Sequence, residues 1–170
     1  MDKHELRAML EETHADAYAW ALSCCRSHPD DAEEVLQTVY LSVLDGRARF
    51  DGRSSFKTWL FGVIRLTEAS MHRRAWVRDL LLAREAGRVR PVEADAVDVE
   101  MDRAERTDLL RGALSSLANR QREVLELVFY HELTVEDAAS VMEIGVGSAR
   151  THYARGKARL AVLLAGLKDS

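Results

Sequence analysis

The residues best suited to chemistry lie near the C-terminus, on a segment whose apolar residues recur at helical spacing. At about 100° of rotation per residue, the segment from Gly147 to about Leu167 places its small and apolar residues on one side: Ala149, Tyr153, Gly156 and Leu160. The opposite side carries hydroxyl, guanidinium and methyl groups: Ser148, Arg150, Thr151, Ala154 and Arg155. Arginine pairs with a guanine edge or a phosphate, a hydroxyl bonds to either, and a methyl packs on thymine. The pattern therefore predicts contact with the major groove of DNA, and the alternative is an amphipathic helix with a solvated basic face.

A shorter helix is predicted directly before this segment. It runs from Val135 to Met142, with Thr134 as its N-cap and Asp137 three residues later. Only residues 143–146 separate the two helices. A short helix, a tight turn and a longer basic helix are typical of a helix-turn-helix.

A second cluster combines basic side chains with aromatic rings. Residues 46–78 carry eight Arg and Lys against two acidic residues. Unstacked bases need an electrostatic groove and a stacking surface, and this composition offers both. The alternative is that the aromatic residues Phe56, Trp59 and Phe61 belong to the protein core.

The overall charge alone does not suggest a nucleic-acid partner. The chain has 24 Lys and Arg against 28 Asp and Glu, a formal net charge of −4. The charges are segregated, however: residues 91–108 hold seven acids against two arginines, whereas residues 145–160 hold four basic residues and no acid. Two basic islands separated by an acidic stretch predict two phosphate-facing surfaces and a solvated connector.

The remaining elements are also predicted to be helices. The first runs from Asp2 to about Ser27, and the second starts at Asp30 as a candidate N-cap and stops at Gly46. The third begins near Ser54 or Ser55 and runs to about residue 74, with a continuation to residue 82 left open. The predicted fold is all-α: a helical domain at 1–84, a flexible acidic linker at 85–103 and a helix-turn-helix domain at 104–170.

Several other functions are not supported by the sequence. Cys24 and Cys25 are adjacent and are predicted to be buried helix residues, with a redox role left open. No metal-ligand spacing, phosphate-binding glycine loop or nucleophile elbow occurs, so we expect no enzyme, metal or cofactor. Uncharged runs are too short to span a bilayer and no secretory leader opens the chain, so we expect a cytoplasmic protein without membrane insertion.

Two regions of the sequence resemble bacterial extracytoplasmic-function (ECF) sigma factors. Residues 31–41 and 49–60, the latter including the pattern Phe-x-Gly-x-Ser-x-Phe-x-Thr-Trp-Leu, resemble the family's second conserved region. Residues 117–125, with the helix-turn-helix after them, resemble its fourth region. The matches cover most of the chain in the family's order.

The resemblance implies a sigma factor that binds core RNA polymerase through the clamp coiled coil and the flap. It also implies recognition of the −10 and −35 elements of promoter DNA and binding by an anti-sigma factor. The implied polymerase-binding positions are Asp31, Glu33, Glu34 and Gln37. The implied −10 contacts are Asp51, Gly52, Arg53, Ser54, Ser55, Lys57, Arg65, Arg73 and Arg74. The implied −35 contacts are Ser148, Arg150, Thr151, Ala154, Arg155 and Lys157.

The chain departs from the family pattern at several positions. Leu66 and Ser70 replace polar residues that the family usually carries on the third helix. In the helix-turn-helix turn, Glu143 replaces the usual glycine, and Gly145 replaces a serine N-cap at a cost of only a few tenths of a kcal/mol. Leu66 and Ser70 favour an alternative function, a sigma-like decoy that sequesters an anti-sigma factor without binding a promoter.

Overall fold

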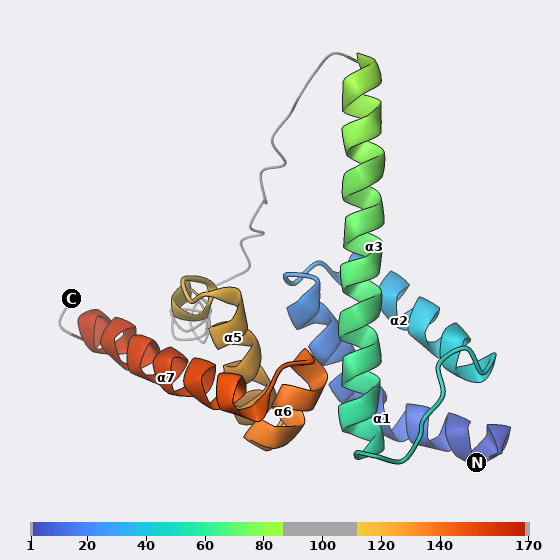
Figure 1. Ribbon diagram of the computed structural model, residues 1–170, viewed down its shortest axis with the longest axis horizontal. Helices are drawn as coiled ribbons and strands as arrows, with labels where there is room; N and C mark the ends of the chain where they lie inside the picture. The colour runs from blue at the N-terminus through green and yellow to red at the C-terminus, as the bar shows by residue number, and fades with distance from the viewer. Residues whose placement is uncertain (1, 87–111, 169–170) are drawn as a thin grey trace. The chain divides into compact units, whose positions relative to one another are not determined.

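The structure, a computed structural model, describes residues 2–86 and 112–168, and all regular elements in these two ranges are helices (Figure 1). They form two compact units. The N-terminal unit contains α1 (Lys3–Cys24), α2 (Pro29–Leu44) and α3 (Phe56–Ala86). We use the name C-terminal unit for the whole described stretch 112–168, which contains a helical turn at 112–115, α5 (Asn119–Leu125), the π-helical turn η1 (Glu126–Tyr130), α6 (Val135–Met142) and α7 (Val146–Lys168). The predicted all-α fold is confirmed, whereas most of the expected linker at 85–103 lies outside the described residues.

The core of the N-terminal unit is built where α1, α2 and the start of α3 pack on one another. Trp20 of α1 is fully buried and stacks on Phe61 of α3, with ring centroids 5.6 Å apart and an interplanar angle of 11°. The Trp20 indole also donates a hydrogen bond to the Phe61 carbonyl over 3.1 Å, which satisfies its N–H group. This pair therefore fixes α1 against the beginning of α3.

The end of α1 and the start of α2 differ from the sequence prediction, and α1 ends at Cys24 and not at about Ser27. The N-cap of α2 is His28, with Pro29 in the first turn, so the prediction of Asp30 as the N-cap is wrong. A proline at the first helical position lacks only an N–H that would be unpaired anyway, and its fixed φ starts the helix earlier. The predicted stop at Gly46 is confirmed, because Gly46 follows the C-cap with a φ of +72°.

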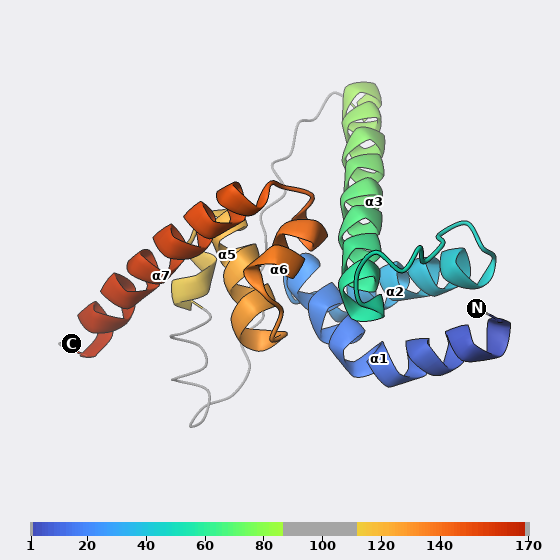
Figure 2. The same ribbon diagram turned by 60° about the horizontal axis from the view of Figure 1, so that its bottom comes forward.

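The third helix is much longer than its packed part. Phe56, Leu60, Phe61 and Ile64 are buried, whereas the side chain of Trp76 is 62% exposed. Figure 1 and Figure 2 both show α3 extending beyond α1 and α2. The continuation left open by the sequence therefore occurs, and α3 projects a solvent-exposed half from the N-terminal unit.

In the C-terminal unit, α5 packs directly on α7. A Cβ atom added to Gly156 of α7 would lie 3.0 Å from Leu125 Cδ1 and 3.3 Å from the carbonyl oxygen of Gln121. A side chain at this crossing point would require Leu125 and Gln121 to move by a few tenths of an ångström, so glycine favours the close approach of the two helices. The buried side chains of Val124, Leu125 and Ala149 complete this contact region.

Candidate nucleic-acid interface

The helix-turn-helix is defined by local hydrogen bonds at each end of α6. The Thr134 hydroxyl accepts a bond from the Asp137 backbone N–H over 3.0 Å and donates to the Asp137 carboxylate over 2.7 Å, which confirms the predicted N-cap. At the other end, the N–H groups of Glu143 and Ile144 bond to carbonyls of α6 over 3.2 and 3.1 Å, with Glu143 at a φ of +53°. These bonds form a Schellman motif that stops α6, so a three-residue turn leads into α7.

All six side chains predicted to contact the −35 element lie on the solvent-facing half of α7, opposite the buried Ala149 and Gly156. The structure exposes each of them: Ser148, Arg150, Thr151, Ala154, Arg155 and Lys157. At about 100° per residue, Thr151 and Ala154 lie near the centre of this face, and Arg150 and Arg155 lie about 140° apart at its two edges. The two arginines therefore cannot address the same base.

Three of these side chains already have partners within the C-terminal unit. Arg150 Nη2 donates to Glu136 Oε1 of α6 over 2.6 Å, and this hydrogen bond holds the pKa of Glu136 below its usual range. Lys157 lies over the ring of Tyr153, with Nζ 5.2 Å from the ring centroid. The Thr151 hydroxyl donates to the Gly147 carbonyl over 3.0 Å, so its oxygen keeps only acceptor capacity. Glu136 was not predicted, because a pairing between residues on two different helices leaves no local pattern in the sequence.

The loop predicted to capture a −10 base is folded by its own contacts. Asp51 Oδ1 accepts from the Arg53 backbone N–H over 3.2 Å, and Asp51 Oδ2 lies 3.2 Å from Arg53 Nε. Gly52 between them has a φ of +74°, a conformation that glycine adopts without strain. Phe50, the residue before the loop, packs against Phe56 and Trp59, with centroid distances of 5.5 and 5.4 Å.

These aromatic contacts decide between the two interpretations of the basic, aromatic cluster. Phe56 and Phe61 are buried, which confirms the core alternative for these two residues but not for Trp59. Trp59 and Phe50 are half-buried and contact each other and Phe56. The three rings therefore form a cluster that joins the residue before the loop to the first turn of α3.

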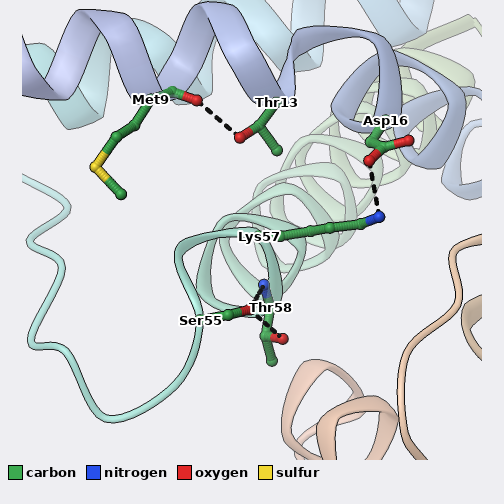
Figure 3. A network of polar contacts seen from close by, with 6 residues as sticks. All are labelled: Met9, Thr13, Asp16, Ser55, Lys57 and Thr58. Atoms are coloured by element: carbon green, nitrogen blue, oxygen red, sulfur yellow. Dashed lines mark hydrogen bonds and ion pairs between the residues drawn. The ribbon is translucent and has the colours of Figure 1, made fainter.

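The first turn of α3 uses two of the predicted DNA-contacting side chains for internal contacts (Figure 3). Ser55 caps the helix, because its Oγ accepts from the Thr58 backbone N–H over 3.1 Å. Lys57 Nζ lies 2.7 Å from Asp16 Oδ2 of α1, and the Lys57 side chain is 29% exposed. Ser55 thus caps the start of α3, and Lys57 connects the start of α3 to α1.

The other predicted −10 residues are distributed along and around α3. Ser54 is half-buried in the loop, and Arg65 is half-buried on the helix. Arg73 and Arg74 are exposed on the projecting half of α3, and Arg74 lies about 25 Å along the axis from Lys57 at 1.5 Å per residue. Successive basic positions turn by about 80–100°, so these side chains wind around the helix and do not form one flat patch.

The outer face of α2 carries the side chains predicted to bind polymerase. Asp31, Glu33, Glu34 and Gln37 are all exposed, and the opposite face of the helix is buried. Leu41 is 58% exposed, and helical geometry places it within about 40° of Glu34 and Gln37. This exposed leucine was not assigned to the site, although its position on the polar face of α2 is visible in the sequence.

The two cysteines lie outside the surfaces predicted to contact DNA. Cys25 is buried, and its burial raises the pKa of the thiol to about 12, whereas Cys24 is half-buried. Within residues 2–86 and 112–168, no group of three or more His, Cys, Asp or Glu side chains could hold a metal ion. No helix in the same two ranges is long and apolar enough to cross a membrane.

Comparison with known proteins identifies the family. The Sigma-70 region 2 family model matches residues 9–78, and the Sigma-70 region 4 family model matches residues 107–160. The chain is 24% identical to RNA polymerase sigma factor YlaC of Bacillus subtilis, over 78% of this chain and 77% of that protein. It is 29% identical to ECF RNA polymerase sigma factor SigC of Mycobacterium tuberculosis, over 89% and 79% respectively.

A solved structure shows the same fold. Sigma factor RpoE, in a co-crystal structure with the anti-sigma factor NepR from Bartonella quintana, matches with a TM-score of 0.69 and 23% identity over 94% of this chain and 96% of that one. The two matched regions cover most of the chain, and they contain the packed helices and the helix-turn-helix described above. The chain belongs to the sigma-70 family of RNA polymerase sigma factors, within its ECF group.

Proposed function

We propose that this sigma factor divides promoter recognition among three of its surfaces. The outer face of α2 binds core RNA polymerase, the loop at 51–55 with α3 engages the −10 element, and the outer face of α7 reads the −35 element. The observation that carries this proposal is the helix-turn-helix, which turns Arg150, Thr151 and Arg155 to the solvent-facing half of α7. These side chains supply the donors and acceptors that major-groove recognition requires.

The outer face of α2 has the composition of a docking surface. Leu41 lies about one turn C-terminal to Gln37 on the same face of α2, and an exposed apolar side chain next to polar ones is typical of protein interfaces. In the sigma family, the matching face docks on the clamp coiled coil of the largest polymerase subunit. The carboxylates of Glu33 and Glu34 supply negative charge for a basic partner surface there.

The loop at 51–55 suits capture of a base extruded from the DNA duplex. Extrusion costs a few kcal/mol of unstacking, which a binding pocket must offset. The Asp51–Arg53 contacts and the aromatic support from Phe50 order the loop before DNA arrives. An ordered loop loses less conformational entropy on binding, so more of its interaction energy is available to stabilise promoter opening.

The basic residues of α3 contribute to the −10 region in different ways. Arg73 and Arg74 are exposed on the projecting half of the helix, where they can neutralise phosphates of the non-template strand. Lys57 must exchange Asp16 for a phosphate before it makes the same contact. Arg73 and Arg74 are therefore expected to contribute more to the salt dependence of binding than Lys57.

The proposed partners follow from this division of surfaces. The C-terminal unit contacts the polymerase flap while α7 lies in the major groove, and the chain works as a non-catalytic subunit in the cytoplasm, where polymerase and promoters are found. An anti-sigma factor is a further partner, since the structural neighbour RpoE was solved with one. A decoy that sequesters an anti-sigma factor is the competing function, and the exposed DNA-facing set on α7 argues against it.

The α2 assignment is tested by charge reversal. The double variant Glu33→Lys/Glu34→Lys should bind core polymerase at least tenfold more weakly, with an unchanged melting temperature because both side chains are exposed. The matched control is Glu11→Lys/Glu12→Lys, which reverses two exposed charges on α1. Equal affinity of the two double variants in a fluorescence-anisotropy titration would contradict docking through α2.

A further inference from the structure

The ion pair between Glu136 and Arg150 joins the two helices of the helix-turn-helix. Arg150 Nη2 lies 2.6 Å from Glu136 Oε1, a short charge-assisted hydrogen bond. Glu136 lies in the first turn of α6, whose start is fixed by the Thr134 N-cap. The carboxylate therefore holds the arginine from a rigid neighbouring element.

We expect this pair to contribute little to stability. The two side chains are 68% and 56% exposed, and ion pairs at such exposed sites contribute little to the free energy of unfolding. The pair can instead affect how the Arg150 guanidinium, a candidate DNA-reading group, contacts DNA. This inference rests on the proposed reading of the −35 element by α7.

We propose that Glu136 is a positioning residue for −35 specificity, which directs Arg150 toward a base edge and away from the phosphate backbone. A guanidinium has five N–H donors, so one hydrogen bond to Glu136 leaves donors for a second, planar partner. A guanine edge offers two uncharged acceptors, N7 and O6, and can share Arg150 with a carboxylate. A phosphate carries a full negative charge, and placing it beside the Glu136 carboxylate is repulsive.

The pair also reduces the conformational freedom of Arg150 before binding. A free arginine side chain has considerable rotamer entropy, which is lost when the side chain is fixed against a base. Glu136 imposes part of this ordering in the unbound protein, so less is lost on binding. Glu136 repels a phosphate and also orders the Arg150 side chain. Both effects favour a contact of Arg150 with a specific base over a contact with the DNA backbone.

The test compares Glu136→Gln with the matched variant Glu143→Gln in holoenzyme made from the full chain and core polymerase. Both changes remove one negative charge from the helix-turn-helix, but only Glu136 forms the pair with Arg150. The probe is a promoter duplex that the wild-type holoenzyme selects from a pool randomised at the −10 and −35 elements, together with its single-base −35 variants. Competition binding at several salt concentrations gives the discrimination and the salt slope.

The proposal predicts that Glu136→Gln loses about fivefold or more of its discrimination at the base position read by Arg150. Its affinity for non-promoter DNA should rise, with a salt slope steeper by about one, because Arg150 becomes free to bind a phosphate. Glu143→Gln should keep the wild-type discrimination. The Arg150→Ala variant identifies the base position that Arg150 reads, because discrimination is lost there. When Glu136→Gln is added to Arg150→Ala, discrimination should not fall further.

Two results would overturn the proposal, and they are distinguishable. If Arg150→Ala loses discrimination while Glu136→Gln retains it, Glu136 has no positioning role and −35 reading by α7 stands. If Arg150→Ala itself retains full discrimination and affinity, Arg150 does not read the −35 element and the proposed function of this helix is wrong. Circular dichroism of each variant checks that the helices remain folded.

Discussion

Replacing Glu143 by glycine should make the C-terminal unit more stable. Glu143 has a φ of +53° in the turn after α6, and this left-handed conformation costs an L-residue roughly 1–2 kcal/mol. Glycine avoids that cost but loses about 0.5–1 kcal/mol more backbone entropy on folding. The side chain is exposed, so its removal sacrifices no buried contact. The net expectation is a gain of roughly 0.7 kcal/mol, within a range of about 0–1.5 kcal/mol, which for a unit of this size raises the melting temperature by about 3–6 °C.

The two units can be observed separately in the full chain. All three tryptophans, Trp20, Trp59 and Trp76, lie in the N-terminal unit, so tryptophan fluorescence reports its unfolding alone. Far-UV circular dichroism reports the helices of both units. Glu143→Gly should therefore shift the melting transition seen by circular dichroism and leave the fluorescence transition where it is.

The control for this prediction is Glu143→Ala. Alanine removes the same carboxylate but keeps the Cβ atom that makes a positive φ unfavourable. If Glu143→Gly melts no higher than Glu143→Ala, the positive φ of residue 143 imposes no strain on the turn, and the expected gain in stability is refuted.

Three further predictions concern other contacts. Asp16→Ala breaks the 2.7 Å pair with Lys57 and should lower the unfolding free energy by less than about 1 kcal/mol in urea titrations followed by tryptophan fluorescence; a larger loss would show that the pair is not a surface interaction. Cys25, with its thiol pKa raised to about 12, should react with iodoacetamide at pH 8 more slowly than Cys24. Because the unfolded thiol ionises near pH 9, stability should fall above that pH, and Cys25→Ala should reduce this dependence. Gly156→Leu should destabilise the C-terminal unit by about 1–3 kcal/mol, seen by circular dichroism, since Leu125 and Gln121 leave no space there; an unchanged melting temperature would contradict the packing of α5 on α7.

Local patterns were sufficient to predict most of the helices. The N-cap at Thr134 and the stop at Gly46 depend on residues within a few positions of each helix end, so the sequence records them directly. The start of α2 was missed because Pro29 competes with Asp30 as a start signal, and a proline in the first turn was the stronger one. The full length of α3 was left open because its second half is largely exposed and its apolar residues follow no clear stripe.

The exposed positions of the candidate site were predicted better than its internal contacts. Helical periodicity placed five of the six −35 candidates on the solvent-facing half of α7, as the structure does, and the sixth, Lys157, came from the family resemblance and is also exposed. The pairs Lys57–Asp16 and Arg150–Glu136 join different helices, so only the tertiary fold brings them together. Such pairs change what a site can do, since they decide which basic side chains are available to DNA in the unbound protein.

Promoter-specific transcription is the decisive measurement for the proposed function. Run-off transcription with purified core polymerase, the full chain and a set of genomic fragments should yield discrete transcripts that require this protein. Arg150→Ala or Arg155→Ala should reduce those transcripts on promoters with an intact −35 element. If the folded chain binds core polymerase or an anti-sigma factor but directs no promoter-specific transcript from any fragment, the protein is a decoy and does not recognise promoters.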